Sequence, residues 1–203
     1  MGGWIRPSQG TVRIDGMRFE NHERALRAVV KLVPDTPMFY PELNAREHIE
    51  LVIRTHRRHN SAGWRDQTAE WLRGFGLDRN QQAYPSSFSR GMQYKLAVIL
   101  SMLAEPRLLL LDEPFGPLDP YSQNFLAERL KSSAKQGMSV IASTHLLPSH
   151  YPPDRAIMLD QGEVALDSAF STLWQPDTGE ALARVPEAVM AEVHRQRRSG
   201  ADG

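Results

Sequence analysis

The chain has 203 residues, enough for one large domain or for one domain with an inserted subdomain. Its 24 basic and 24 acidic side chains cancel, which argues against a general nucleic-acid-binding protein. The absence of cysteine excludes a disulfide framework and a thiolate metal site, and no apolar run approaches the roughly 20 residues of a membrane-spanning helix. Without the apolar core of a signal peptide either, the composition indicates a soluble, cytoplasmic protein.

The first 43 residues predict short β-structure around a short helix. Thr11–Ile14 is a β-prone run, and Asn21 is expected to cap a helix over His22–Arg27. Val29–Val33 is a second β-prone run, and a loop with three prolines follows it over Pro34–Leu43. This part is therefore expected to begin an α/β core.

The middle of the chain changes to helical periodicity. Apolar residues recur at helical spacing over Ala45–Arg58, Ala62–Phe75 and Met92–Leu103. The two tryptophans of the second helix are expected to pack in its core rather than to bind a ligand. Three helices between strands predict a helical insert over residues 44–105.

The α/β core resumes with the apolar run Leu108–Leu111, which is typical of a strand buried on both faces. Two carboxylates, Asp112 and Glu113, follow at once, and Pro114 prevents further strand pairing. Because a parallel sheet presents its chemistry at the carboxyl edge, this pair is a candidate site. Buried carboxylates are costly unless they are paired or bind a metal.

The rest of the chain predicts the end of the core and a helical tail. A helix with proline near its start and glycine past its end is expected over Pro120–Lys135, and a strand over Ser139–Ala142. A hairpin with Gln161-Gly162 in its turn is expected over Ala156–Leu166, and Ser168–Gly203 looks helical. The expected organisation is a first core part over 1–43, the helical subdomain over 44–105, a second core part over 106–173 and a tail over 174–203.

The segment Phe88-Ser89-Arg90-Gly91-Met92-Gln93 precedes the third helix. Ser89 is a favoured helix cap, and the free N–H groups and positive dipole at a helix N-terminus suit phosphate oxygens. Gly91 lets a backbone or ligand approach closely. On its own, this pattern is better explained by a simple capped helix start.

Two shorter segments complete the set of motifs. Gly116-Pro117-Leu118-Asp119 follows the acidic pair, and Asp119 also fits as a simple cap before Pro120. Ser143-Thr144-His145 follows the next strand. A lone histidine is most often a packed or surface residue. The functional interpretation of His145 therefore depends on its position at the end of a strand.

Together, in this order, these segments resemble the nucleotide-binding subunits of ABC transporters over most of the chain, which implies a P-loop NTPase-like α/β core with an inserted helical subdomain. The resemblance implies that Asp112 holds Mg²⁺ through water and that Glu113 is the general base for the attacking water. It implies that His145 touches the γ-phosphate of ATP. The signature loop, with Ser89, Arg90, Gly91 and Met92, would contact the γ-phosphate held by the opposite subunit, and Asp119 would belong to the D-loop at the dimer interface.

The sequence departs from the family in several places. It contains no P-loop, Gly-x-x-x-x-Gly-Lys-Ser/Thr, and the N-terminal strands and most of the P-loop helix that precede Ile5–Gly10 in the family are missing. Arg90 replaces the first glycine of the signature motif and Met92 its glutamine. Asp35 stands where the family usually has a glutamine that helps to bind Mg²⁺, and it can still be a metal ligand.

The resemblance predicts an ATP-binding subunit that couples ATP binding and hydrolysis to transport, here as an incomplete chain with little or no activity alone. Its expected partners are a second ABC ATPase subunit, in a homo- or heterodimer, and a membrane-spanning subunit that holds it at the inner face of the membrane. Alternatives are a non-catalytic partner that donates its signature loop to an intact ATPase, and a non-functional gene remnant. A DNA-handling ABC ATPase is disfavoured because the helical insert has no long heptad arm, and no nucleic-acid partner is expected.

Overall fold

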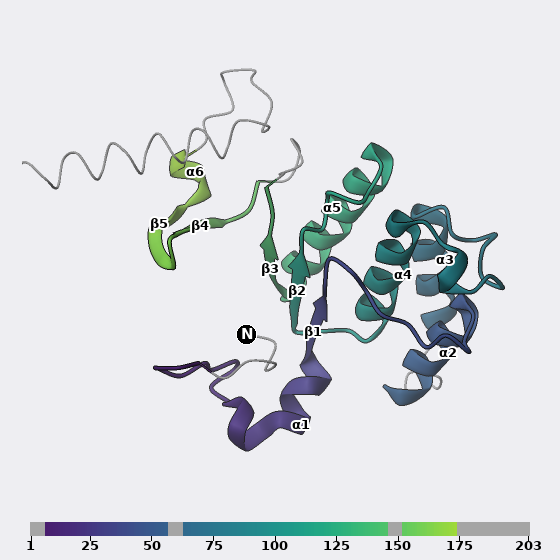
Figure 1. Ribbon diagram of the computed structural model, residues 1–203, viewed down its shortest axis with the longest axis horizontal. Coiled ribbons are helices and arrows are strands. Elements are labelled where there is room, and N and C mark those ends of the chain that lie inside the picture. The colour runs from purple at the N-terminus through teal and green to yellow at the C-terminus, as the bar shows by residue number, and fades with distance from the viewer. Residues whose placement is uncertain (1–6, 57–62, 146–151, 174–203) are drawn as a thin grey trace, which may run out of the picture. The chain divides into compact units, whose positions relative to one another are not determined.

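The computed structural model describes residues 7–56, 63–145 and 152–173 (Figure 1). The chain forms two compact units that divide after Thr144. The candidate carboxylates and the signature segment belong to the first unit, and His145 begins the second.

The first unit is built on a parallel sheet with the strand order β1-β2-β3. The strands are β1 (Val30–Val33), β2 (Leu108–Asp112) and β3 (Ser139–Ser143). The leucine run therefore forms the central strand, and all four of its leucines are buried, as the sequence predicts. Because the strands are parallel, their carboxyl ends meet at one edge. That edge carries Asp112 and Glu113.

The two faces of this sheet differ in how well they are covered. On one face Val33, Leu109 and Leu111 are at most 2% exposed, and α4 packs against β1 and α5 against β3. On the other face, Leu32 and Ile141 flank Leu110 in register, and both are about 40% exposed. The second face therefore presents apolar side chains that the described residues leave partly uncovered.

The helical subdomain consists of α2 (Ala45–Thr55), α3 (Trp64–Gly74) and α4 (Arg90–Leu103), which gather together in Figure 1. Asn44 starts α2 with a capping box, because its side chain accepts from the N–H of Glu47 while the Glu47 side chain accepts from the N–H of Asn44. Trp71 is buried against aromatic rings of Phe75 and Phe125, as expected for a core residue. Trp64 is only partly buried.

Most helix boundaries agree with the sequence, with small shifts at the ends. Helix α5 spans Pro120–Lys135, as predicted. Helix α4 begins at Arg90 rather than at Met92, because Ser89 is its cap. Helix α3 begins at Trp64 after Gly63, which has a positive φ of 91°. The predicted ends at Arg58 and Ala62 lie outside the described residues.

The predictions for residues 11–29 are wrong in two respects. Thr11–Ile14 is not a strand, because among the described residues Ile14 bridges only to Met17, across a tight turn. Helix α1 spans Phe19–Val29 with Arg18 at its N-cap. Asn21 therefore lies inside the helix instead of capping it, and the backbone kinks at His22.

The second unit contains a hairpin and a short helix: β4 (Arg155–Asp160), β5 (Glu163–Ala169) and α6 (Phe170–Leu173). Gln161 and Gly162 both have positive φ, 50° and 85°, as a type I′ turn requires. The sequence predicts this turn correctly. The predicted helix from Ser168 is wrong at its start, since β5 continues through Ala169, and residues 174–203 lie outside the described part. None of the helices described here has the length and apolarity needed to cross a bilayer.

Candidate functional site

The acidic pair stands at the carboxyl end of the central strand. Asp112 is in register with Ser143 at the end of β3, and its Oδ1 accepts a hydrogen bond of 2.6 Å from the Ser143 hydroxyl. The N–H of Glu113 donates to the Ser143 carbonyl at 2.9 Å. One residue of the neighbouring strand therefore fixes both the Asp112 carboxylate and the backbone that carries Glu113.

Glu113 has an unusual backbone conformation. Its φ is +46°, in the left-handed region that few residues other than glycine adopt. Such conformations cost free energy and are concentrated at functional sites. Since Asp112 is still in the strand and Glu113 has left it, the two adjacent carboxylates can serve different groups.

Helix α4 begins at the signature segment. The Ser89 hydroxyl accepts from the N–H of Met92 at 3.3 Å, so Ser89 is the N-cap that the sequence predicts. A methyl group added at Gly91 would lie 2.6 Å from the carbonyl oxygen of Pro117. Glycine at this position is thus required for the start of α4 to lie against the predicted D-loop.

Tyr94 connects α4 to the end of β2. Its side chain is fully buried, and its hydroxyl donates to the Asp112 carbonyl at 3.3 Å. Burial raises the pKa of Tyr94 above its usual range, and the charges of Asp112, Asp35 and Glu113 raise that pKa further. The hydroxyl therefore stays protonated as a donor, and the three candidate carboxylates all act on it.

Lys95, one residue further on, connects α4 to the D-loop. Its Nζ lies 2.7 Å from Oδ2 of Asp119, and Asp119 also caps α5 by accepting from the N–H of Ser122 at 2.9 Å. Desolvation opposes the shift, but the hydrogen bonds from Lys95 and Ser122 hold the pKa of Asp119 well below its usual range. Asp119 is a helix cap in this structure, and its role at a dimer interface stays a prediction.

Arg90, the first residue of α4, reaches the loop after β1. Its Nη2 lies 2.5 Å and 2.7 Å from the two carboxylate oxygens of Asp35. The first turns of α4 thus contact three candidate segments: the Asp35 loop, the end of β2 and the D-loop. The structure does not place His145 with them, because His145 belongs to the second unit.

The acidic side chains have the donor chemistry that Mg²⁺ prefers. Mg²⁺ is held through one or two carboxylates and keeps several waters and phosphate oxygens. Asp112 is exposed at the sheet edge and offers such an oxygen. Within residues 7–56, 63–145 and 152–173, no three His, Asp or Glu side chains gather as a complete ligand set. The residues present therefore fit an ion held mainly by nucleotide and water.

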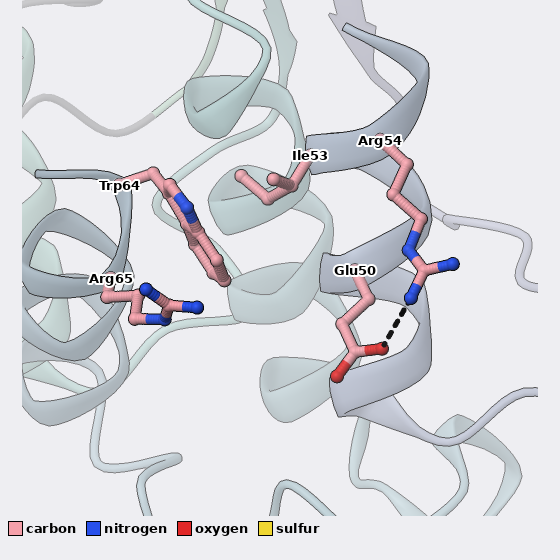
Figure 2. A pocket seen from close by; sticks show the side chains of 5 residues that line it. All are labelled: Glu50, Ile53, Arg54, Trp64 and Arg65. Carbon is pink, nitrogen blue, oxygen red and sulfur yellow. Dashed lines mark ion pairs between the residues drawn. The ribbon is translucent and has the colours of Figure 1, made fainter. Parts of the chain in front are cut away.

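A pocket of about 660 Å³ lies away from these residues, between α2 and α3. In Figure 2, Trp64 and Arg65 project from α3, and Ile53, Glu50 and Arg54 project from the facing α2. The Glu50–Arg54 ion pair is long, at 3.9 Å, and Arg65 stacks over the Trp64 ring. None of the candidate site residues lines this pocket, so the chemistry predicted from the sequence is not located there.

Comparison with known proteins decides the family. Residues 1–116 match the family model described as "ABC transporter". The chain is 33% identical over 177 residues to the ABC-type transporter ATP-binding protein EcsA of Bacillus subtilis. The matched region covers 84% of this chain and 69% of EcsA. The chain belongs to the ATP-binding subunits of ABC transporters. It is also 29% identical to the bacitracin transport ATP-binding protein BcrA of Enterococcus faecalis, with 45% of BcrA covered.

Solved structures of ABC subunits confirm the fold class. An ATP-binding subunit of an ABC transporter matches 95% of this chain with a TM-score of 0.79 and 28% identity, over 79% of its own length. The ATP-binding cassette MJ0796, a dimer in a post-hydrolysis state with ADP and Pi bound, matches 83% of this chain with a TM-score of 0.71, 25% identity and 77% of its own length covered. The fold is thus the α/β core of an ABC ATPase with its helical subdomain.

The residues that assemble this ABC subunit's candidate site were partly missed in the sequence. Tyr94 and Lys95 hold motif residues, yet no motif pattern singles them out. Ser143 belongs to the segment Ser143-Thr144-His145, but the sequence alone gives it no role in holding Asp112. A signal exists for Lys95, since this cation directly precedes the apolar run Leu96–Leu100, and in the structure its side chain is only 12% exposed. Ser143 could have been found as the hydroxyl directly opposite Asp112 in a parallel register.

Proposed function

We propose that this chain contributes two half-sites to an ATP-driven transporter dimer. Asp112 and Glu113 serve one nucleotide, as the Mg²⁺ carboxylate and the general base for the attacking water. The start of α4, with Ser89, Arg90 and Gly91, binds the γ-phosphate of a nucleotide held by a second ABC subunit. The observation that carries this proposal is the hydrogen bonding of α4 to both the strand end and the D-loop.

The charges of the two half-sites support their use on different nucleotides. The α4 N-terminus joins a positive dipole end to a cationic Arg90 and suits a phosphate directly. Asp112 and Glu113 are anions, so they repel a phosphate unless a cation lies between them. When bound, Mg²⁺ would neutralise charge on the phosphate oxygens. Glu113 would accept the proton of the water, with Asp112 oriented by Ser143.

Residues 1–203 contain no Gly-x-x-x-x-Gly-Lys-Ser/Thr segment, so none of them is given the role of cradling the β-phosphate. His145 is proposed to contact the γ-phosphate, on the strength of the family motif alone.

The loop after Asp35 is proposed to bind the membrane-spanning subunit. Met38 is 93% exposed and Tyr40 is 62% exposed, which is unusual for large apolar side chains. The loop is nevertheless anchored, because the N–H of Tyr40 donates to Nε2 of buried His48, and Nδ1 of the same ring donates to the Asn44 carbonyl. An anchored loop with exposed apolar side chains fits a partner that attaches the subunit to the membrane.

The half-site formed by Ser89, Arg90 and Gly91, called the signature half-site below, is tested by replacing Ser89 with glutamate in the native subunit. Ser89→Glu places a negative charge where the phosphate should bind, so ATP-driven association is expected to weaken at least about tenfold. Light scattering with and without Mg²⁺-ATP measures this. Ser86→Glu, an equal change at an exposed residue before α4, should leave association unchanged. Equal weakening by both variants would count against the proposed half-site.

A further inference from the structure

The first residue of α4 carries a charge that is unfavourable at the start of a helix. Arg90 is a cation at the positive end of the helix dipole, and the first turn of α4 contains no acidic residue. Its counter-ion comes instead from Asp35, 55 residues away in sequence and two residues beyond β1. Asp35 therefore supplies from another element the negative charge that α4 lacks.

The geometry of this contact leaves much of the guanidinium available. Only Nη2 of Arg90 contacts Asp35, and it lies near both carboxylate oxygens. Among the described residues, no hydrogen bond uses Nε or Nη1 of Arg90, and the side chain is 66% exposed. Arginine carries five N–H donors, so it can bind Asp35 and an anion at the same time.

Both ends of the contact rest on fixed elements. Asp35 follows Pro34 directly after β1, whose last residue Val33 is buried and paired with Leu111. Helix α4 packs against β1, and Gly91 holds its start against the D-loop. A side chain held between such elements loses less conformational freedom when it binds a ligand.

We infer that Asp35 is a positioning residue, which holds the Arg90 guanidinium at the start of α4 so that its remaining N–H groups meet the phosphate of the second subunit's nucleotide. This inference rests on the proposed function of the signature half-site. It gives Asp35 a role through Arg90, because both of its carboxylate oxygens lie within hydrogen-bond distance of Nη2 of Arg90.

The test is steady-state ATP hydrolysis by the native complex, with KM and kcat measured separately for Asp35→Asn, Arg90→Gln and the double variant. An exposed ion pair has a modest coupling energy, so Asp35→Asn is expected to raise KM about two- to fivefold and to change kcat less than about twofold. Arg90→Gln should raise KM further. The double variant should match Arg90→Gln alone, because Asp35 acts through Arg90.

A matched control lies in the same unit. Asp15 forms an ion pair of 3.0 Å with Arg107, and the two side chains are 43% and 69% exposed. Asp15→Asn removes the same charge from a similar surface pair away from α4 and should leave KM unchanged. Melting temperatures of all variants show whether a change in KM follows from lost stability instead.

Two sets of results would overturn the inference. If Arg90→Gln raises KM but Asp35→Asn leaves it unchanged, lowers it, or adds its full effect to that of Arg90→Gln, the positioning role is wrong and the signature half-site stands. If Arg90→Gln itself leaves KM unchanged, the role of Arg90 in the proposed half-site is wrong, and the positioning role falls with it.

Discussion

Replacing Glu113 by glutamine is expected to lower the kcat for ATP hydrolysis of the native complex by about 100- to 10,000-fold, the usual contribution of a general base. The amide has nearly the same shape as the carboxylate, so the strained backbone at φ +46° and its hydrogen bond to Ser143 should persist. It cannot, however, accept the proton of the attacking water. Initial-rate measurements with Mg²⁺-ATP test this, and KM should change little.

The control for this change is Glu128→Gln, which removes an exposed carboxylate from α5. This variant should keep kcat within about twofold of the unsubstituted complex, as is usual for a surface substitution. If Glu113→Gln behaves like Glu128→Gln, the assignment of Glu113 as the base is wrong.

Shortening a buried side chain in the central strand β2 is expected to cause the largest loss of stability. Leu109 is fully buried in β2, so Leu109→Ala removes buried methyl groups and leaves a cavity between the sheet and its helices. The expected loss is about 2–5 kcal/mol in the free energy of unfolding. Chemical denaturation of the purified subunit, followed by circular dichroism, gives this value.

Leu32→Ala is the matched control, because it makes the same change in the same sheet. Leu32 is 41% exposed in β1, so its truncation should cost about 1 kcal/mol or less. Similar losses for the two variants would mean that the face carrying Leu32 is covered in the folded protein.

The sequence predicts the elements whose local signals agree with their tertiary surroundings. The leucine run Leu108–Leu111 forms a buried central strand because no polar residue interrupts it. Helix α5 has both of its boundaries marked, by Asp119 with Pro120 and by Gly137. Thr11–Ile14 has β-propensity too, but within the described part of the chain it forms a single bridge and no strand pairing. Propensity alone therefore does not make a strand.

The sequence does not predict the pairings that assemble the candidate site. Arg90 pairs with Asp35, 55 residues away in sequence, and Lys95 pairs with Asp119, 24 residues away. Both pairs depend on how α4 packs against the sheet and the D-loop. The motif resemblance names Arg90, Asp35 and Asp119 individually, but it does not connect them. The chain's charge balance is equally uninformative, because complementary pairs cancel in any total.

The central claim is that the catalytic acids and the signature loop of one chain serve different nucleotides. It is tested most directly by ATP hydrolysis in dimers of the native subunit that contain two differently tagged copies. Ser89→Glu and Glu113→Gln are placed either both on one copy or one on each. With both changes on one copy, each site loses one half, so activity should vanish. With one change on each copy, one site loses both halves and the other stays intact, so hydrolysis should persist. Activity only when both changes share one copy would contradict the account.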